Sequence, residues 1–367
     1  MRRTYILTLL TLAFVSMSCE RDLDFDTPSE ESEGSMIINA VAVTGSPLTV
    51  YLNKTYPVGK TPRLTAPTYD QAVFFKDDIT TDYVSNVYYD NTAITGARVE
   101  ATVNGQQTYT LILNEEDKSY VCDYVPTSGD HIEVRAAVEG EELKAETSVP
   151  AKPTIEVLSH EVLDQNPYQD RNGLFGGTDT IMRLTCRISD MGGEQYYRLR
   201  VRSERVDHYK IVTSFDQEKM EPIYSTLVYY YMQDVYFSED ELFKDIRLTS
   251  SMGGWETSFS SVFDNVLMKG GNYTFTIDSP KACNTSGSLR ALNTHLSSDG
   301  PNFEPRVMVE LQAISPELYQ YMKSVQLYRV TEDDVYSEPV QIYSNVQNGW
   351  GILGALSYDR HFVEYGE

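Results

Sequence analysis

The chain has 367 residues, a formal net charge of -24 at pH 7 and a hydrophobic content of 41%. Because binding to a phosphate backbone requires clustered Lys and Arg, this acidity excludes nucleic acid as an expected partner, and it equally disfavours attraction to an anionic lipid surface. The length is sufficient for two domains that each bury a core.

Residues 1–18 have the parts of a secretory signal peptide. Arg2 and Arg3 give it a positive start, and residues 5–15 form an apolar run of about eleven residues. A helix that crosses a bilayer permanently needs roughly 20 apolar residues, so this run predicts a cleaved signal rather than an anchor. Cleavage removes both arginines and no acidic residue, and the net charge therefore moves from -24 to -26.

Cys19 is the predicted lipidation site. It follows Ser16-Met17-Ser18, and a cysteine directly after small or slim residues at the end of a signal is typical of a lipobox. The thiol of such a cysteine accepts diacylglycerol, and its freed amine accepts a third fatty-acyl chain such as palmitate. Since more than one chain makes anchoring stable, Cys19 predicts a lipid-anchored protein; simple secretion is the alternative.

Residues 19–33 predict an acidic, solvated tether between the lipid and the first domain. Seven acidic residues are mixed here with Ser, Thr and Pro. The spacing is superficially that of a calcium loop, but Thr27 stands where such a loop needs glycine, and no metal site is expected. An acidic run directly after the acylated cysteine also resembles the signal that sends lipoproteins of Bacteroidota to the outer face of their outer membrane. The resemblance implies an outer-membrane protein that faces the cell exterior.

Residues 34–152 predict an immunoglobulin-like β-sandwich. Apolar and polar residues alternate from Ala97 to Asn104, and the pair Asn104-Gly105 supplies the positive φ angles of a tight hairpin turn. A second hairpin is expected around a turn at Gly140. Residues 53–91 interrupt the pattern with prolines and tyrosines and form a long insertion, a kind of loop that is usually functional or disordered.

Residues 153–367 predict a second, larger β-sandwich or barrel-like domain with one short helix, so the expected fold class is all-β. Ser315 is an N-cap followed by Pro316, and the helix is expected to bury a stripe of Leu318, Tyr321, Met322 and Val325. Short strands are expected on either side of it, at residues 307–312 and 340–343. Cys186 falls on the apolar side of an alternating strand, which predicts a buried thiol.

No catalytic, cofactor or metal motif is apparent. The five histidines are scattered, and the sequence has no HExxH, no GxSxG and no phosphate-binding loop. Beyond Cys19 the cysteines are Cys122, Cys186 and Cys283, an odd number from which no disulfide framework is readable. Carboxylates are abundant, and a glycosidase pair is defined by separation in space rather than in sequence, so a hydrolase stays open as a third hypothesis.

Tyrosine is the unusual residue, with 27 in the chain. One interpretation is that Tyr fills half-exposed sheet faces, for which it has high preference. The functional interpretation is an amphipathic platform that stacks on the sugar rings of a glycan or buries the side chains of a peptide. The residues proposed for this role are Tyr83, Tyr88, Tyr89, Tyr229, Tyr231 and Trp255.

A row of arginines is the other candidate binding feature. Arg198, Arg200 and Arg202 alternate on one side of a predicted strand, roughly 7 Å apart. They are suited to binding an anionic ligand bidentately. The favoured alternative is a face that neighbouring Asp and Glu residues neutralise.

Several short segments together resemble a known family. They are Ile37-Ile38-Asn39, Tyr196-Tyr197-Arg198-Leu199, residues 237–243, residues 314–321, Glu338-Pro339-Val340, residues 344–352 and Gly354-Ala355. With the lipobox they are similar to the Bacteroidota lipoproteins of domain-of-unknown-function family 4249. Because that family is typically encoded beside a TonB-dependent outer-membrane transporter, the resemblance implies a role in surface capture or uptake. It implies no catalytic residue.

The expected function is therefore that of a surface-exposed lipoprotein without chemistry of its own. It is a binding or accessory component of a TonB-dependent nutrient uptake system, with outer-membrane lipid, the transporter and a glycan or peptide ligand as its partners. The alternative is a structural or adhesive cell-surface lipoprotein, for which tandem β-domains and strong acidity are also suitable.

Overall fold

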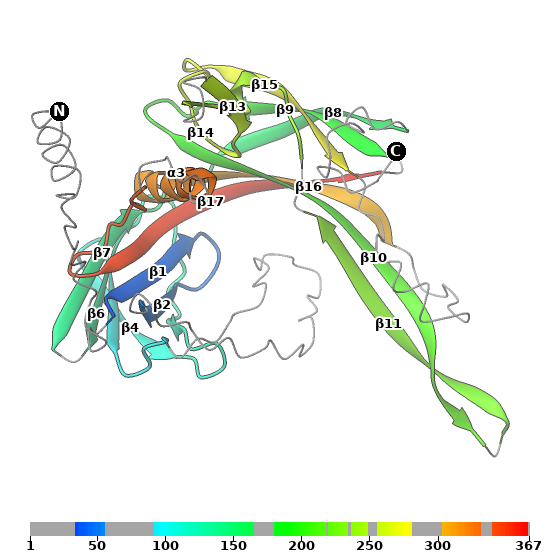
Figure 1. Ribbon diagram of the computed structural model, residues 1–367, viewed down its shortest axis with the longest axis horizontal. Helices are drawn as coiled ribbons and strands as arrows, with labels where there is room; N and C mark the ends of the chain where they lie inside the picture. Colours follow the sequence, from blue (N-terminus) through cyan, green and yellow to red (C-terminus); the bar gives the residue numbers. More distant parts are fainter. Residues whose placement is uncertain are drawn as a thin grey trace, which may run out of the picture. The chain divides into compact units, whose positions relative to one another are not determined.

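The computed structural model describes residues 34–55, 92–138, 140–164, 180–217, 219–233, 236–248, 255–280, 303–331 and 340–365 (Figure 1). The chain divides into two units, and the larger one is formed by Met36–Asn53 and Ala93–Glu367. The strands and helices below belong to this unit, apart from the last residue of β2. The predicted signal peptide, Cys19, the acidic tether and most of the insertion lie outside the described residues.

The described elements are strands, one long helix and one 3-10 turn, which confirms the all-β fold class. In chain order they are β1 (Met36–Val43), β2 (Thr49–Lys54), β3 (Arg98–Val103), β4 (Gln107–Leu113), β5 (Tyr120–Val121), β6 (His131–Val138), β7 (Glu141–Ser148), β8 (Thr154–Leu163), β9 (Ile181–Ser189), β10 (Tyr196–Asp216), β11 (Glu221–Gln233), η1 (Glu241–Phe243), β12 (Lys244–Leu248), β13 (Trp255–Phe259), β14 (Val262–Asp264), β15 (Asn272–Pro280), β16 (Phe303–Ile314), α3 (Pro316–Thr331) and β17 (Trp350–Glu364).

Most strands belong to one 12-stranded sheet of order β11-β10-β16-β17-β1-β2-β5-β4-β3-β6-β7, with β14 also paired to β10. Figure 1 shows the first and last described strands, blue β1 and red β17, running side by side. They pair in parallel, with Ile38 opposite Gly351 and Ala42 opposite Ala355. A three-stranded sheet, β15-β9-β8, and the pair β12-β13 complete the unit.

The first core is formed by strands in which buried and more exposed side chains alternate. In β1 and β6 every second side chain is buried, and Ile38, Val99 and Val134 are fully buried in this core. Asn104 and Gly105 have φ angles of 53° and 66°, so the predicted hairpin turn is confirmed, as is the turn at Gly140. The predicted strands of this part of the chain therefore follow from local pattern and turn chemistry.

The second core lies on the apolar side of β10 and against β9 and β15. Tyr197, Leu199 and Val201 are buried there, as the alternation predicts. Cys186 is fully buried in the same core, and burial raises the pKa of its thiol to about 12. It is therefore a small hydrophobic residue, as predicted, and it forms no disulfide with the other described cysteine, Cys122.

Helix α3 covers one end of the β16-β17 face. Ser315 caps it, because its Oγ accepts a hydrogen bond from the Leu318 amide at 3.4 Å and a second from the Ala355 amide at 3.2 Å. Leu318 is buried against Ile314, Ile352 and Leu356. The helix start and the burial of Leu318 are as predicted, but the helix has 16 residues and is not short, and Tyr321, Met322 and Val325 of the expected stripe are only half-buried. The cap itself ties the helix to β17.

The segment before β17 corrects one prediction. Residues 340–343 form no strand, although their composition suits one. The segment instead leads to Asn345, whose side chain donates to the Glu146 and Leu353 carbonyls and accepts from the Leu353 amide. Within the segment itself, the Tyr343 amide donates to Ser324 Oγ of α3 at 2.9 Å rather than to a neighbouring strand.

The large sheet contains strands from both sides of residues 152 and 153, where the sequence suggests a division into two domains. β1 from the first part pairs with β17, and Lys144 of β7 forms a bridge with Gln347. The domain boundaries themselves stay a prediction. Within the described residues, no helix combines the length and apolar character needed to span a membrane.

Candidate functional site

The structure places the proposed platform residues in different parts of the chain. Tyr83, Tyr88 and Tyr89 lie outside the described residues. Tyr229 and Tyr231 lie on β11 at the end of the large sheet, whereas Trp255 begins β13, opposite Leu248 in a separate two-stranded sheet. Tyr229 and Tyr231 are therefore the pair that the backbone brings together, on one strand and two residues apart.

The long hairpin of β10 and β11 carries this pair, and Figure 1 shows the two strands running together beyond the rest of the sheet. Strand β16 pairs with β10 only from Tyr196 to Val206, whereas β11 pairs with it as far as Asp216 opposite Glu221. From Asp207 to Asp216, β10 thus pairs with β11 alone among the described strands. We call this two-stranded part the ribbon.

One face of the ribbon continues the side of β10 that holds Leu199 and Val201, and it has charged as well as aromatic positions. Residues directly opposite each other in an antiparallel pair share a face. Tyr229 stands opposite Asp207, Tyr231 opposite Arg205, and Leu227 opposite Tyr209. By the period of two, these positions lie on the side of β10 on which Leu199 and Val201 are buried in the second core.

The opposite side of β10 carries charge instead. The side chains concerned, called the charged face here, are Arg198, Arg200, Arg202 and Glu204 of β10, Arg306, Glu310 and Gln312 of β16, and Arg360 of β17. They share one face because β16 pairs with β10 and with β17 in register. These side chains include five guanidinium groups and two carboxylates, and Glu364 of β17, opposite Arg306, adds a third carboxylate to the face.

Glu310 is the centre of the charged face. It is 1% exposed and lies between two arginines: Arg360 Nε donates to its Oε2 at 2.6 Å, and Arg200 Nη1 lies 3.6 Å from its Oε1. The Gln312 amide donates to Oε1 at 2.7 Å. The prediction that neighbouring acids neutralise the arginine row is confirmed for Arg200. All three arginines of that row have interaction partners.

A second ion pair lies further along the same face. Arg306 Nε donates to Glu204 Oε2 at 3.0 Å, and the Arg306 guanidinium lies 4.1 Å above the ring of Phe362. Glu204 Oε1 and Gln312 Oε1 are buried, with no hydrogen-bond partner among the residues that the structure describes. The sequence indicated the arginines of this face but not their partners, because Glu310 and Arg360 come from strands distant in the chain.

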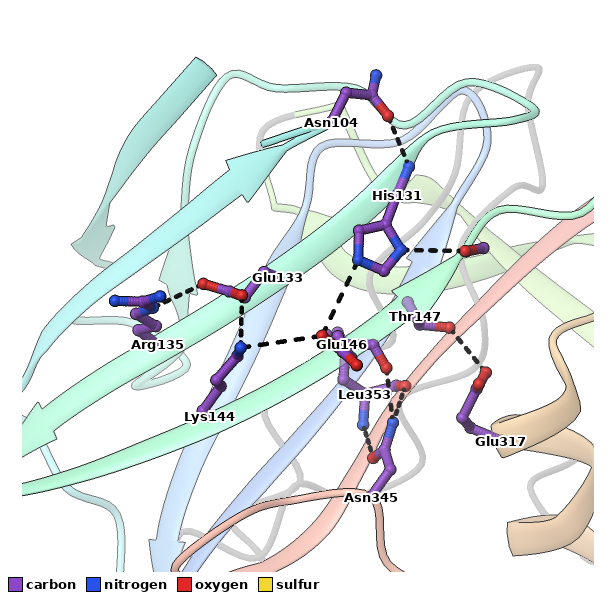
Figure 2. A network of polar contacts seen from close by, with 11 residues as sticks. Asn104, His131, Glu133, Arg135, Lys144, Glu146, Thr147, Glu317, Asn345 and Leu353 are labelled. Atoms are coloured by element: carbon purple, nitrogen blue, oxygen red, sulfur yellow. Dashed lines mark hydrogen bonds and ion pairs between the residues drawn. The ribbon is translucent and has the colours of Figure 1, made fainter. Parts of the chain in front are cut away.

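Figure 2 shows a polar network on the outer side of β6 and β7. Glu133 accepts from Arg135 at 2.6 Å and pairs with Lys144 at 2.7 Å, and the bond with Lys144 is the main reason that its pKa is lowered. The His131 ring lies near Ser148 and Glu146. Because these side chains are partly exposed, their ion pairs contribute little to stability and form no enclosed site.

The same network joins the sandwich to distant parts of the chain. Thr147 of β7 is 2% exposed and donates to Glu317 of α3 at 3.1 Å, and Asn345 joins Glu146 to Leu353 (Figure 2). Asn348 in turn donates to the Glu142 carbonyl. The segment 344–352, which carries much of the family resemblance, is therefore structural here, since it fastens β17 to β7.

Asp130 is a hydrogen-bond centre in the loop before β6. Its carboxylate accepts hydrogen bonds from the Tyr124 hydroxyl at 2.6 Å, from the backbone amide and the hydroxyl of Thr127, and from the side-chain amide of Asn104. Burial acts to raise the pKa of Asp130, but these bonds outweigh it and lower the pKa to about 2. The carboxylate thus organises a loop and the adjacent hairpin turn.

No group of three or more His, Cys, Asp or Glu side chains suited to a metal ion occurs in the part of the chain that the structure describes. The described polar groups act mainly in ion pairs and loop caps, and β11 of the ribbon is one of several strands that end a described sheet. These features define an all-β sandwich protein with one covering helix and a long two-stranded ribbon.

The comparisons assign this architecture to a family. The model of the family described as Domain of unknown function (DUF4249) matches residues 20–361, and the chain belongs to this family. The family resemblance seen in the sequence is thereby confirmed. A search of curated proteins found no match.

Proposed function

We propose that this protein is a lipid-anchored lipoprotein on the outer surface of a Bacteroidota outer membrane. In this proposal it acts without chemistry of its own, as a binding or accessory component of a TonB-dependent nutrient uptake system. The N-terminal signal and Cys19 support the location. The family's usual neighbour, a TonB-dependent transporter, supports the pathway.

The observation that carries the proposal is the ribbon. A two-stranded hairpin is at best marginally stable alone in water, and three or more strands or a packed face are needed for stability. β10 and β11 nevertheless stay paired as far as Asp216 and Glu221. The tyrosines of β11 are suited to burial against a partner, because Tyr gives a large contact area at small entropic cost. A ribbon of this kind favours a protein that works by contact.

The test is purification of the tagged, lipidated protein from its native outer membrane in mild detergent, with the bound proteins identified by mass spectrometry. We expect a TonB-dependent transporter in near-equal amount. The matched control is the same preparation from cells that express a tagged, unrelated surface lipoprotein. Recovery of the protein alone, or of oligomers of it, contradicts the proposal and favours the structural or adhesive alternative.

If the transporter is recovered, its cargo identifies the ligand to be tested. The purified soluble domain is then titrated with the glycan or peptide that the transporter imports. Binding by the pair but not by the transporter alone is expected for a capture component, whereas equal binding in both cases is expected for an accessory that only stabilises the transporter.

A further inference from the structure

We infer that β1 and β17 form a mechanical clamp, a pair of strands that resists force applied between the two ends of the chain. Force that enters before Met36 reaches the described fold at the start of β1, and force that enters after Glu364 reaches it at the end of β17. Because the two strands are parallel, these entry points lie at opposite ends of the pair. Pulling the ends of the chain apart therefore slides one strand along the other.

The register of the clamp determines how a load is shared. It runs without a shift through seven pairs, from Ile37 opposite Trp350 to Val43 opposite Leu356. The hydrogen bonds of a parallel pair are evenly spaced along the strands. A sliding load stretches all of them together, whereas a load that lifts one strand end from its neighbour breaks them one after another. The sliding geometry therefore requires the larger force.

Both strands of the clamp are held on two sides within the large sheet. β1 lies between β17 and β2, and β17 lies between β16 and β1. Force at the start of β1 thus loads two ladders of hydrogen bonds at once. Force at the end of β17 also meets nine antiparallel pairs with β16. Neither strand can be peeled from the sheet by breaking a single ladder.

Both faces of the clamp are packed, which keeps water from its hydrogen bonds. On one face Ile38, Ala42 and Leu353 are fully buried in the first core. On the other face Ile352 and Leu356 are buried against α3. A backbone hydrogen bond that breaks in such surroundings cannot be exchanged at once for a bond to water, so its rupture costs more than that of an exposed bond.

Gly351 allows the close approach of the two strands at the second pair of the clamp. Its φ is 107°, in the region that favours glycine, and a Cβ atom added to it would lie 2.0 Å from the carbonyl oxygen of Ile38, its partner in the register. A side chain at residue 351 would therefore separate the strands at the end of the clamp where force from the N-terminal side first arrives.

The use of the clamp in the cell rests on the proposed function, which places the membrane anchor at Cys19. Residues 19–35 connect that anchor to β1. A pull on a molecule held by the domain is then balanced at the anchor, and the balancing force enters the fold through the start of β1. The clamp keeps β1 in the sheet when that force is directed along the strand. Its strength is a property of the fold and can be measured without the membrane.

The first experiment stretches single molecules of the full mature chain, residues 19–367, in two geometries. Both have one handle at Cys19, in place of the acyl chains. The second handle follows Glu367 in one geometry and is attached to Gln347 in the other. Gln347 is exposed and precedes β17 by three residues, so it lies at the same end of the clamp as Met36.

The measured quantity is the force at which β1 leaves the sheet, recognised from the length of chain set free. We expect this force to be several times larger with the C-terminal handle, because that geometry slides β1 along β17, whereas the handle at Gln347 lifts β1 away. Equal forces in the two geometries, or a smaller force with the C-terminal handle, overturn the inference.

The second experiment compares Gly351→Ala with Gly45→Ala in the geometry with the C-terminal handle. Gly45 is the matched control, since its φ is also positive, at 84°, but nothing lies within 4 Å of its added Cβ. Under constant load the unfolding rate of Gly351→Ala should exceed that of Gly45→Ala by about tenfold or more, because the added methyl group separates the strands. Equal rates overturn the inference. If Gly351→Ala does not fold, the comparison of the two geometries in the parent protein decides.

The clamp and the proposed function fail in different experiments. If the forces in the two geometries are equal, the clamp is wrong and the result of the co-purification is unaffected. If no transporter co-purifies with the protein, the proposed function fails, and the force measurement still decides whether β1 and β17 form a clamp.

Discussion

Leu318 of α3 packs directly against Gly354 of β17. A Cβ atom added to Gly354 would lie 2.8 Å from the Leu318 Cβ and 2.9 Å from its Cδ1. Real Cβ atoms do not approach so closely, so the helix lies on the sheet at this distance only because residue 354 has no side chain. The absence of a side chain at Gly354 is thereby explained by its contact with the helix.

Substitution of Gly354 by Ala is therefore expected to destabilise the protein by about 1–3 kcal/mol, the usual cost of overpacking a filled core. Gly96→Ala is the matched control, since nothing lies within 4 Å of its added Cβ and its φ is not positive. The control is expected to be neutral or slightly stabilising. Urea unfolding of the purified domain measures both, and equal midpoints for the two variants would show that the close contact has no energetic weight.

Substitution of Asn345 by Ala is expected to cost about 2–3 kcal/mol. The side chain makes three hydrogen bonds that hold β17 to β7, and its removal leaves backbone groups of Leu353 and Glu146 without partners. Asn272→Ala, at an exposed position of β15, is the control and should change stability by less than about 0.5 kcal/mol. The loss of hydrogen-exchange protection should appear at β7 and β17 together. Loss confined to residue 345 and its neighbours argues against the fastening role.

Replacement of Glu310 by Gln is expected to destabilise the protein by about 3–5 kcal/mol, because it removes the buried carboxylate that pairs with the largely enclosed guanidinium groups of Arg360 and Arg200. The control is Glu100→Gln, which removes an exposed pair with Arg98 and should cost at most about 1 kcal/mol. The midpoints of denaturant unfolding measure both losses, provided that the dependence of the unfolding free energy on denaturant concentration is the same in each variant. A loss no greater than that of the control would mean that the charged face is solvated.

Stability is expected to fall in acid partly through Asp130. Its pKa in the folded protein is about 2, below the ordinary value of 3.8, so its contribution is complete above about pH 4 and is lost as the pH falls toward 2. The contribution is about 1–2 kcal/mol after allowance for solvent screening. Unfolding free energy measured from pH 2 to 7 should therefore rise less steeply with pH in Asp130→Asn than in the parent. Identical slopes would assign the acid sensitivity to other carboxylates.

Substitution of Cys19 by Ser is expected to move the protein from the membrane pellet to the soluble fraction, because no acyl chain can then be attached. Fractionation with metabolic labelling by a palmitate analogue measures the change. Cys122→Ser is not a suitable control, since its side chain is buried, so Ser18→Ala serves instead and should keep its label. Membrane retention of the Cys19 variant would assign the anchor to another feature.

Features encoded by neighbouring residues could be predicted from the sequence. The turn at Asn104-Gly105, the cap at Ser315 and the alternation of Tyr197, Leu199 and Val201 each depend on a few adjacent positions, and each is found in the structure. Residues 340–343 show the limit of this reasoning. Their pattern suits a strand, but the Tyr343 amide donates to Ser324 of α3, a partner that comes from the helix and not from a sheet.

Partners that come from distant strands could not be predicted. The alternation of Arg198, Arg200 and Arg202 marks a face, but nothing in that stretch tells that Glu310 and Arg360 share it, because the register of β10, β16 and β17 depends on the whole sheet. The ribbon illustrates the same limit. The tyrosines of β11 are visible in the sequence, whereas the point at which β16 leaves β10 is not. The role of Tyr229 and Tyr231 stays a prediction.

The parallel pairing of β1 with β17 has a consequence for how the chain is made. A ribosome synthesises Ile38 more than three hundred residues before Gly351, its partner in the sheet. Until the last strand emerges, β1 has an open side and the first core lacks Leu353 and Ala355. Contacts of such long sequence separation make folding slow. The first core is thus completed only after β17 is made, and the loss of residues 350–356 should be felt at β1, at the opposite end of the chain.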